Sequence, residues 1–212
     1  MASPFSFPSP LYTIADTLGR PELSFVEITE KLCAGGAKVL QLRAKDLPSR
    51  DFLVLAQEVR KICRRSGCLL IVNDRADIAL TIDADGVHVG QEDLPLKAAR
   101  KVLGPNKIIG VSTHDLQQAR AAEHDGADYV GFGPMYGTTT KATSYTARGL
   151  DQLREIRAMV RLPIVAIGGI TTERALATLT AGADAVAMIS DLVLAKNITA
   201  KVRATLTHLM VH

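Results

Sequence analysis

Eight short apolar runs recur along the chain, and each is followed by a stretch with helical spacing. This alternation limits the fold more than any other feature of the sequence, because runs of about five to seven apolar residues have the length of buried strands. Strands that alternate with helices form parallel sheets, since each helix returns the chain to the edge where the strand began. The expected strands begin at Leu11, Val39, Leu69, Gly86, Ile108, Tyr129, Pro163 and Ala185.

A short pattern recurs where a helix should give way to a strand. It reads GGAKVL at 35–40, DGADYV at 125–130 and AGADAV at 181–186. The glycine suits the left-handed conformation that ends many helices, and repeated units of this kind predict an α/β fold with a single-domain (β/α)8 TIM barrel over residues 11–212. An open doubly wound sheet would share much of the pattern. We expect the Pro- and Ser-rich residues 1–10 to form a flexible tail.

Composition excludes several classes of partner. The net charge of +3 comes with no basic run, which argues against nucleic-acid binding, and no apolar run approaches the roughly 18 residues of a membrane span. The start of the chain lacks the pattern of a signal peptide. Cys33, Cys63 and Cys68 are odd in number and match no zinc spacing, so free thiols and a cytoplasmic location are expected. The sequence leaves open whether the protein is a monomer or a small homo-oligomer.

The strand that begins at Val39 ends in the polar stretch QLRAKD. Side chains alternate along a strand, so Gln41, Arg43 and Lys45 share one face, while Leu40 and Leu42 share the other. Because Lys and Arg are rarely buried alone, the polar face must meet water, an internal ion pair or an anionic ligand. In a barrel, the carboxyl ends of the strands carry the chemistry.

Carboxylates follow two neighbouring strands. Asp74 comes after the third strand and Asp93 shortly after the fourth, so the barrel should bring them together. Two such carboxylates repel unless a proton or cation lies between them, and oxygen ligands of this kind suit Mg²⁺. The alternative is structural: either Asp caps a helix or pairs with Arg75 or Arg43.

Two stretches could hold phosphate groups. The long loop over 134–148 is rich in Gly and hydroxyl side chains, and it could close over a ligand or be a disordered surface loop. The pair Gly168-Gly169 precedes a helix after strand seven, where barrels often bind phosphate, although a plain tight turn also fits. The candidate residues are Thr138, Thr140, Lys141, Gly169 and Ser190.

Three further side chains have open roles. His88 lies within the fourth strand and is either a ligand contact or a barrel histidine. Ser112 ends strand five and either meets a ligand or caps the following helix, and Tyr12 either stacks on a heterocycle or belongs to the core. The other histidines, including His114, are expected at the surface.

Seven stretches, taken in order, resemble the thiamine-phosphate synthase family, and the resemblance covers nearly the whole chain from Leu11 to Ser190. It implies an enzyme that joins 4-amino-2-methyl-5-hydroxymethylpyrimidine diphosphate to a thiazole phosphate through a dissociative, carbocation-like step. The implied products are thiamine phosphate and pyrophosphate. The stretches are QLRAKD, VNDRADIAL, DGVHVGQEDLP, GVSTH, DYVGFGPMYGTTTK, PIVAIGGI and GADAVAMIS.

The resemblance also implies roles for residues. It makes Asp74 and Asp93 the Mg²⁺ ligands, and Arg43, Lys45, Ser112 and Lys141 catalytic. The implied binding residues for the pyrimidine diphosphate are Gln41, Arg43, Lys45, Asn73, Ser112 and Lys141. Those for the thiazole phosphate are Thr138, Thr140, Gly169, Ile189 and Ser190.

The chain departs from the family pattern at two positions, and two alternatives stand beside the synthase. Arg75 stands where the family often has an acid, and Gly137 replaces a commoner Pro, but neither change removes a residue that the resemblance assigns to chemistry. The first alternative is a paralogous thiazole tautomerase, whose members tend to lack the full set of cations and carboxylates. The second is a non-catalytic thiamine-phosphate-binding barrel, which would not need the pair Asp74 and Asp93.

Overall fold

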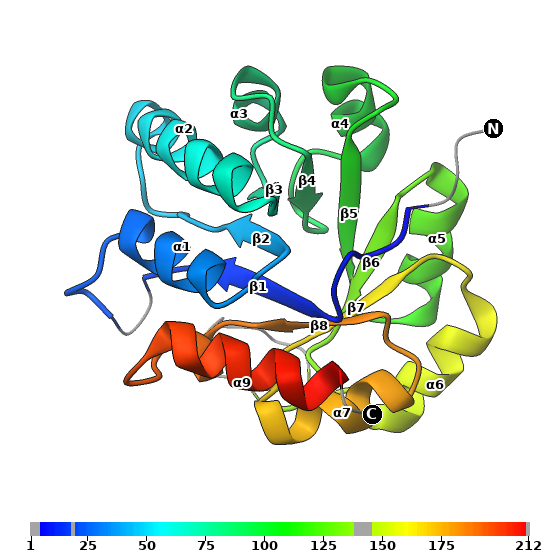
Figure 1. Cartoon of the computed structure of the whole chain (residues 1–212). Coiled ribbons are helices and arrows are strands. Elements are labelled where there is room, and N and C mark those ends of the chain that lie inside the picture. Colours follow the sequence, from blue (N-terminus) through cyan, green and yellow to red (C-terminus); the bar gives the residue numbers. More distant parts are fainter. Residues whose placement is uncertain (1–4, 18–19, 138–145, 211–212) are drawn as a thin grey trace.

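The computed structural model describes residues 5–17, 20–137 and 146–210. These residues form a closed barrel of eight parallel strands in sequence order, with helices around the outside (Figure 1). The single-domain TIM barrel is thereby confirmed, and the open doubly wound sheet is excluded. The strands are β1 (Leu11–Ala15), β2 (Val39–Leu42), β3 (Leu69–Asn73), β4 (Gly86–Val89), β5 (Ile108–Thr113), β6 (Tyr129–Phe132), β7 (Ile164–Ile167) and β8 (Ala185–Met188).

The helices follow the strands as the alternation predicts, with the short α8 and the longer α9 both after β8. Helix α9 packs against α1 and α7 and completes the outer layer (Figure 1). In the described part of the chain, no helix combines the length and apolar character needed to cross a membrane. The helices are α1 (Phe25–Ala34), α2 (Ser49–Ser66), α3 (Ala76–Thr81), α4 (Leu96–Leu103), α5 (Leu116–Asp125), α6 (Gly149–Met159), α7 (Thr172–Thr180), α8 (Ser190–Val193) and α9 (Ile198–Met210).

Strand alternation divides the core into two parts. Leu40 and Leu42 belong to the large cluster between the barrel and its helices, whereas Tyr12 and Tyr129 belong to a smaller cluster inside the barrel. Gln41, between the two leucines, is buried on the inner side. The period of two in β2 therefore separates a packing face from a polar face, as the sequence predicted.

The recurrent glycine ends three helices in the predicted way. Gly36, Gly126 and Gly182 have φ angles of 105°, 88° and 115°. Side chains with a Cβ rarely adopt this left-handed region, whereas glycine does so freely. Each turn then leads into the next strand within three residues.

An ion-pair arrangement, which we call the clasp, recurs within the described residues at the amino ends of the strands. In each clasp, an Asp just before an even-numbered strand accepts a hydrogen bond from an Arg of a helix and another from a backbone N–H of the preceding strand. The even-numbered strands β4, β6 and β8 are thereby tied to β3, β5 and β7. The Arg–Asp pairs are Arg60–Asp85 (2.6 Å), Arg100–Asp128 (2.6 Å) and Arg157–Asp184 (3.1 Å), and the N–H donors are Leu70, Ile109 and Ile164.

The N-terminal segment lies across the amino end of the barrel. Phe5 and Phe7 pack edge to face with ring centroids 4.8 Å apart, and the Phe7 ring lies 5.1 Å from the ring of Tyr129 inside the barrel. The carbonyl of Pro10 accepts a hydrogen bond from the N–H of Val186. For residues 5–10 the structure thus differs from the flexible tail expected over 1–10, because the aromatic side chains close the open end of the inner core.

Candidate functional site

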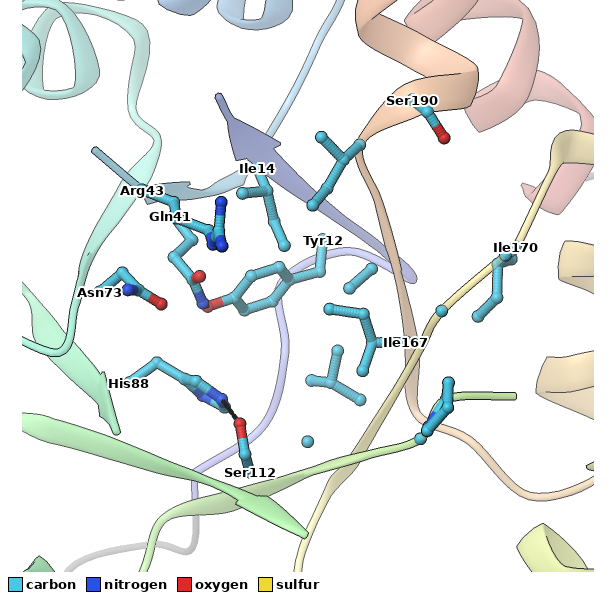
Figure 2. Close-up of a pocket in the computed structure, with 18 of the residues that line it drawn as sticks. Tyr12, Ile14, Gln41, Arg43, Asn73, His88, Ser112, Ile167, Ile170 and Ser190 are labelled. Atoms are coloured by element: carbon cyan, nitrogen blue, oxygen red, sulfur yellow. Dashed lines mark hydrogen bonds between the residues drawn. The ribbon is translucent and has the colours of Figure 1, made fainter. Parts of the chain in front are cut away.

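A pocket opens at the carboxyl ends of the strands and reaches into the barrel (Figure 2). The strand register places inward side chains beside one another, because Ile14 pairs with Gln41 and Asn73 with His88. Seven of the residues to which the resemblance assigns substrate binding line this pocket, and so do Tyr12, His88, His114 and Gly168. The seven are Gln41, Arg43, Asn73, Ser112, Gly169, Ile189 and Ser190.

A chain of hydrogen bonds crosses the barrel interior beneath the pocket. The Gln41 amide donates to the Tyr12 hydroxyl (2.9 Å), which lies 2.9 Å from the hydroxyl of Tyr129. His88 Nδ1 lies 3.0 Å from that second hydroxyl. His88 Nε2 lies 2.9 Å from Ser112 Oγ (Figure 2). Burial raises the pKa of both tyrosines well above the usual 10, so they remain neutral. The chain fixes the orientation of Gln41 and Ser112, whose side chains face the pocket.

Two glycines make room for this chain. A Cβ at Gly110 would collide with the ring of Tyr129, and a Cβ at Gly131 would lie 2.9 Å from the imidazole of His88. His88 and Tyr12 each combine the two roles considered from the sequence. Each side chain is held in the core by hydrogen bonds, and each also lines the pocket.

Arg43 forms an ion pair inside the pocket. Its guanidinium donates to the carboxylate of Asp16 at 2.5 Å, and Asp16 is 5% exposed. Asp16 follows Tyr12 and Ile14 at the spacing of inward-facing residues, so the same alternation that identified Arg43 would have identified it. Of the alternatives for the QLRAKD face, Arg43 therefore meets an internal ion pair, which fixes the cation at the wall of the pocket.

The two carboxylates come together as predicted. Burial raises the pKa of Asp74, and the neighbouring Asp93 raises it further, whereas Lys45 acts in the opposite direction from 3.2 Å. Asp74 also holds a φ of 63°, a left-handed conformation that is uncommon for a residue with a Cβ and that tends to be found at functional sites. Lys45, Asn73 and Asp74 line a second hollow beside the main pocket.

The contacts of the two carboxylates exclude pairing of Asp74 with Arg75 or Arg43, and they leave a structural contact for Asp93. Arg75 pairs with Asp77 at 2.6 Å and donates to Ser49, while Arg43 pairs with Asp16, so neither arginine holds Asp74. Asp93 does have a structural contact, because its carboxylate accepts the backbone N–H of Gly90 at 2.7 Å.

The turn after β7 forms one wall of the pocket. Gly168 and Gly169 have φ angles of 102° and 62°, and a Cβ at Gly169 would lie 2.5 Å from the carbonyl oxygen of Gly137. Gly168, Gly169 and Ile170 all line the pocket. Backbone amides before a helix N-terminus are suited to an anion, and Ser190 lies on the same wall (Figure 2).

Three predicted site residues lie outside the described part of the chain, and the expected surface position of one histidine is wrong. Thr138, Thr140 and Lys141 fall in 138–145, outside the described residues. His114 was expected at the surface, but it is half-buried, lines the pocket and forms a 2.6 Å contact from Nδ1 to the carbonyl of Gly133. The signal was its position one residue after β5, at the active rim of a barrel.

Comparison with known proteins decides the family. Residues 11–192 match the family model described as thiamine monophosphate synthase. The chain belongs to the thiamine-phosphate synthase family, a family of transferases. Its relatives include thiamine-phosphate synthases of Moorella thermoacetica, 47% identical with 91% of this chain and 92% of that protein covered, and of Methanospirillum hungatei, 45% identical with 95% and 98% covered.

Solved structures agree with this membership. Thiamine phosphate pyrophosphorylase from Pyrococcus furiosus superposes with a TM-score of 0.86 at 36% identity, covering 94% of this chain and 95% of that one. Orotidine 5'-phosphate decarboxylase from Pyrococcus horikoshii superposes with a TM-score of 0.67 at 14% identity over 94% and 99%, which shows the shared barrel fold alone. The thiamine-phosphate synthase resemblance seen in the sequence is thereby confirmed.

Proposed function

We propose that this thiamine-phosphate synthase joins 4-amino-2-methyl-5-hydroxymethylpyrimidine diphosphate to a thiazole phosphate. The observation that carries the assignment is one pocket lined by Arg43 and Asn73 on one side and by the Gly168-Gly169 turn on the other. Two anionic substrates need two anion sites, and this pocket has a donor set of the right kind on each wall. The joined product is thiamine phosphate.

Bond cleavage is the demanding step in the proposed reaction. The carbon–oxygen bond to the diphosphate breaks, its electron pair leaves with pyrophosphate, and positive charge develops on the pyrimidine methylene. The lone pair of the thiazole nitrogen then forms the new carbon–nitrogen bond. Because that nitrogen is a neutral nucleophile, the reaction needs no general base, and catalysis rests on stabilising the leaving group.

Arg43 and Lys45 are proposed to bind the diphosphate. The ion pair with Asp16 holds Arg43 in place before substrate arrives, and Lys45 is 42% exposed beside Asp74. Cations held in fixed positions stabilise a developing negative charge without reorganising during the reaction. Asn73 joins the two hollows, and Lys141 completes the proposed diphosphate set.

The pyrimidine end is proposed to meet Gln41 and Ser112. Both are held by the buried chain through Tyr12 and His88, so their polar atoms have fixed positions toward the ring. The thiazole phosphate is proposed to bind at Gly169, Ile189 and Ser190, together with Thr138 and Thr140. The turn after β7, which lines the pocket, supports this assignment.

Asp74, at the second hollow, and the neighbouring Asp93 form a pair that fits Mg²⁺. Asp74 and Asp93 bring two carboxylates together, and burial and their mutual repulsion raise the pKa of Asp74. A divalent cation would relieve that repulsion. When bound, Mg²⁺ supplies positive charge that stabilises a leaving diphosphate.

Replacement of Asp93 by Asn tests this assignment. The Asn side chain can still accept the Gly90 N–H, so the turn is kept while the negative charge is lost. A metal contributes several kcal/mol, so Asp93→Asn should lower turnover by roughly two orders of magnitude, measured as thiamine phosphate formed from both substrates with Mg²⁺. The neighbouring exposed Glu92→Gln is the matched control and should keep its rate. Unchanged turnover in Asp93→Asn would refute the metal role.

The same assay separates the alternatives. A thiazole tautomerase would isomerise the thiazole phosphate alone and form no thiamine phosphate, whereas a binding protein would do neither. The presence of Arg43, Lys45, Asp74 and Asp93 in this chain favours the synthase.

The free state of the three cysteines supports a cytoplasmic place of action. We propose small-molecule substrates as the partners, with neither nucleic acid nor membrane. We further propose that the enzyme acts as a monomer or small homo-oligomer.

A further inference from the structure

Three cysteines meet at the amino end of the barrel, away from the pocket. Cys33 lies in the last turn of α1, Cys63 in the last turn of α2, and Cys68 directly before β3. Although they are separated in sequence, their Sγ atoms all lie within 4.8 Å of one another. Because these positions adjoin the amino end of β3, the cluster lies at the rim opposite the proposed catalytic residues.

We propose that Cys33, Cys63 and Cys68 form a binding site for one thiophilic divalent cation of the Zn²⁺ type, held by three thiolates with one coordination position open. Zn–S bonds of about 2.3 Å in tetrahedral geometry place sulfurs about 3.8 Å apart. Movements of about 1 Å or less bring these sulfurs to that spacing. Soft thiolate ligands favour such ions over Mg²⁺, so the two rims of the barrel select different metals.

The surroundings favour a thiolate at Cys33, whereas the contact with Cys33 and burial raise the pKa values of Cys63 and Cys68, so the ion would have to displace those two protons. Hydrogen bonds from Cys63 and Cys68 lower the pKa of Cys33, and the charge of Lys38 acts in the same direction. The Nε of Arg60 is buried without a hydrogen-bond partner in the described part of the chain, and Arg60 lies one turn before Cys63 on α2. Three thiolates and a divalent ion leave one net negative charge, which lies beside Lys38, while the Arg60 guanidinium is already paired with Asp85.

The cluster also has a way in for the ion. Cys63 is 0% and Cys68 is 4% exposed, whereas Cys33 is only half-buried. A metal ion can therefore reach the site from the Cys33 side, where the open coordination position would face solvent. Plain core packing would not require a half-buried sulfur beside two buried ones.

Cobalt provides a direct test, because Co²⁺ substitutes for Zn²⁺ and absorbs in the near ultraviolet when thiolates bind it. The reduced, metal-free full chain should take up one equivalent of Co²⁺ with this thiolate-to-metal band, and Zn²⁺ should abolish it. Co²⁺ bound instead at Asp74 and Asp93 would give no such band. Excess Mg²⁺ should leave the band unchanged. Absence of the band would overturn the proposal.

Variants and alkylation complete the test. Cys33→Ser should weaken Co²⁺ binding at least about tenfold, since even outer-shell changes cost 10- to 100-fold. The exposed His124→Ala is the control and should bind as the wild type does. A second measurement uses the unmodified chain: Zn²⁺ should slow iodoacetamide labelling of all three cysteines, read by mass spectrometry. Equal labelling with and without Zn²⁺, or an unchanged band in Cys33→Ser, would exclude the site.

Discussion

At the scale of single residues, Arg43 and Lys45 differ although both are assigned to the diphosphate. Arg43 is bound to the buried Asp16, whereas Lys45 is 42% exposed and pairs with Asp74 at 3.2 Å. A buried ion pair costs free energy when one partner is removed, because the remaining charge is left without compensation. An exposed pair contributes little to stability. Removal of Arg43 should therefore reduce both stability and catalysis, whereas removal of Lys45 should reduce catalysis alone.

We predict that Arg43→Ala lowers the free energy of unfolding by roughly 3 kcal/mol, while Lys45→Ala changes it by less than about 1 kcal/mol. Both should lower turnover strongly. Urea denaturation and the coupled assay give the two readouts. The double variant Arg43→Ala with Asp16→Asn should regain stability but no activity, because the buried negative charge is then gone. Equal stability of Arg43→Ala and Lys45→Ala would contradict this account of Asp16.

The Asp74 carboxylate should lower the stability of the metal-free protein at neutral pH, although catalysis needs it. Its pKa is raised above 3.8 in the folded protein, chiefly by burial and then by Asp93, so the folded state binds the proton more tightly than the unfolded chain does. Stability from this group is present below pH 3.8 and is lost as the pH rises through the folded pKa. At neutral pH, without metal, the ionised Asp74 therefore destabilises the protein.

We predict that Asp74→Asn raises the midpoint of thermal unfolding of the metal-free protein at pH 7 and abolishes most activity. Asn tolerates the left-handed φ of this position, so the backbone should be kept. Differential scanning calorimetry at pH 7 and near pH 4 checks the sign, and the gain should shrink at the lower pH. Added Mg²⁺ should stabilise the wild type but not the variant. A lower midpoint for Asp74→Asn at pH 7 would show that its charge is already compensated.

At the scale of elements, the clasps show how neighbouring strands are joined. Each carboxylate accepts from a backbone N–H and from an Arg, as Asp128 does from Ile109 and Arg100. Loss of the carboxylate leaves the Ile109 N–H without its acceptor and removes the ion pair of Arg100, which keeps only carbonyl acceptors; the cost is about 1–3 kcal/mol.

Asp128→Ala is therefore expected to lower the free energy of unfolding by about 1–3 kcal/mol, measured from the urea midpoint at unchanged slope. Asp151→Ala is the matched control, because Asp151 also pairs with an Arg at 2.6 Å but is 92% exposed. That variant should change stability by no more than about 0.5 kcal/mol. Equal stability of the two variants would mean that the clasp contributes no more than an exposed ion pair.

The elements themselves could be predicted because their signals are local. Strand runs, the glycine at 36, 126 and 182, and the alternation around Gln41 all lie within a few residues. Asp16 and His114 were missed although local rules place them at the active rim. The hydrogen-bond chain from Tyr12 to His88 and the cysteine cluster could not be predicted, because they join residues that only the closed barrel brings together.

At the scale of the whole molecule, the two ends of the barrel differ: the carboxyl ends of the strands hold the pocket, and the amino ends are closed by packing. The pocket occupies the first, while Phe5 and Phe7 cover the second and pack on the inner core. The Pro- and Ser-rich composition of this segment predicted a loose tail, because composition does not reveal that the inner core is open at one end. Aromatic burial there adds to stability without contact with the reacting groups.

We predict that Phe7→Ala lowers the free energy of unfolding by about 1–2 kcal/mol, less than the roughly 3–5 kcal/mol of a fully buried Phe. For a chain of this length the unfolding midpoint should fall by about 2–8 °C. Thermal denaturation measures the effect, and turnover well below the midpoint should be unchanged. The exposed Ser6→Ala should have no effect on either quantity. A large loss of turnover in Phe7→Ala would mean that the segment also shapes the pocket.

The clasps also bear on how the chain can be divided. They span residues 60–85, 100–128 and 157–184, so a break within 133–148, between β6 and α6, leaves every clasp and the strands it joins inside one piece. Fragments cut there each keep their clasps, and on reassembly they need to re-form only the two strand contacts β6–β7 and β8–β1. A break within 100–128 separates Arg100 from Asp128, and reassembly of those fragments must rebuild that tie as well. The molecule is thus built from pairs of strands, and a split enzyme made from it should be cut between pairs.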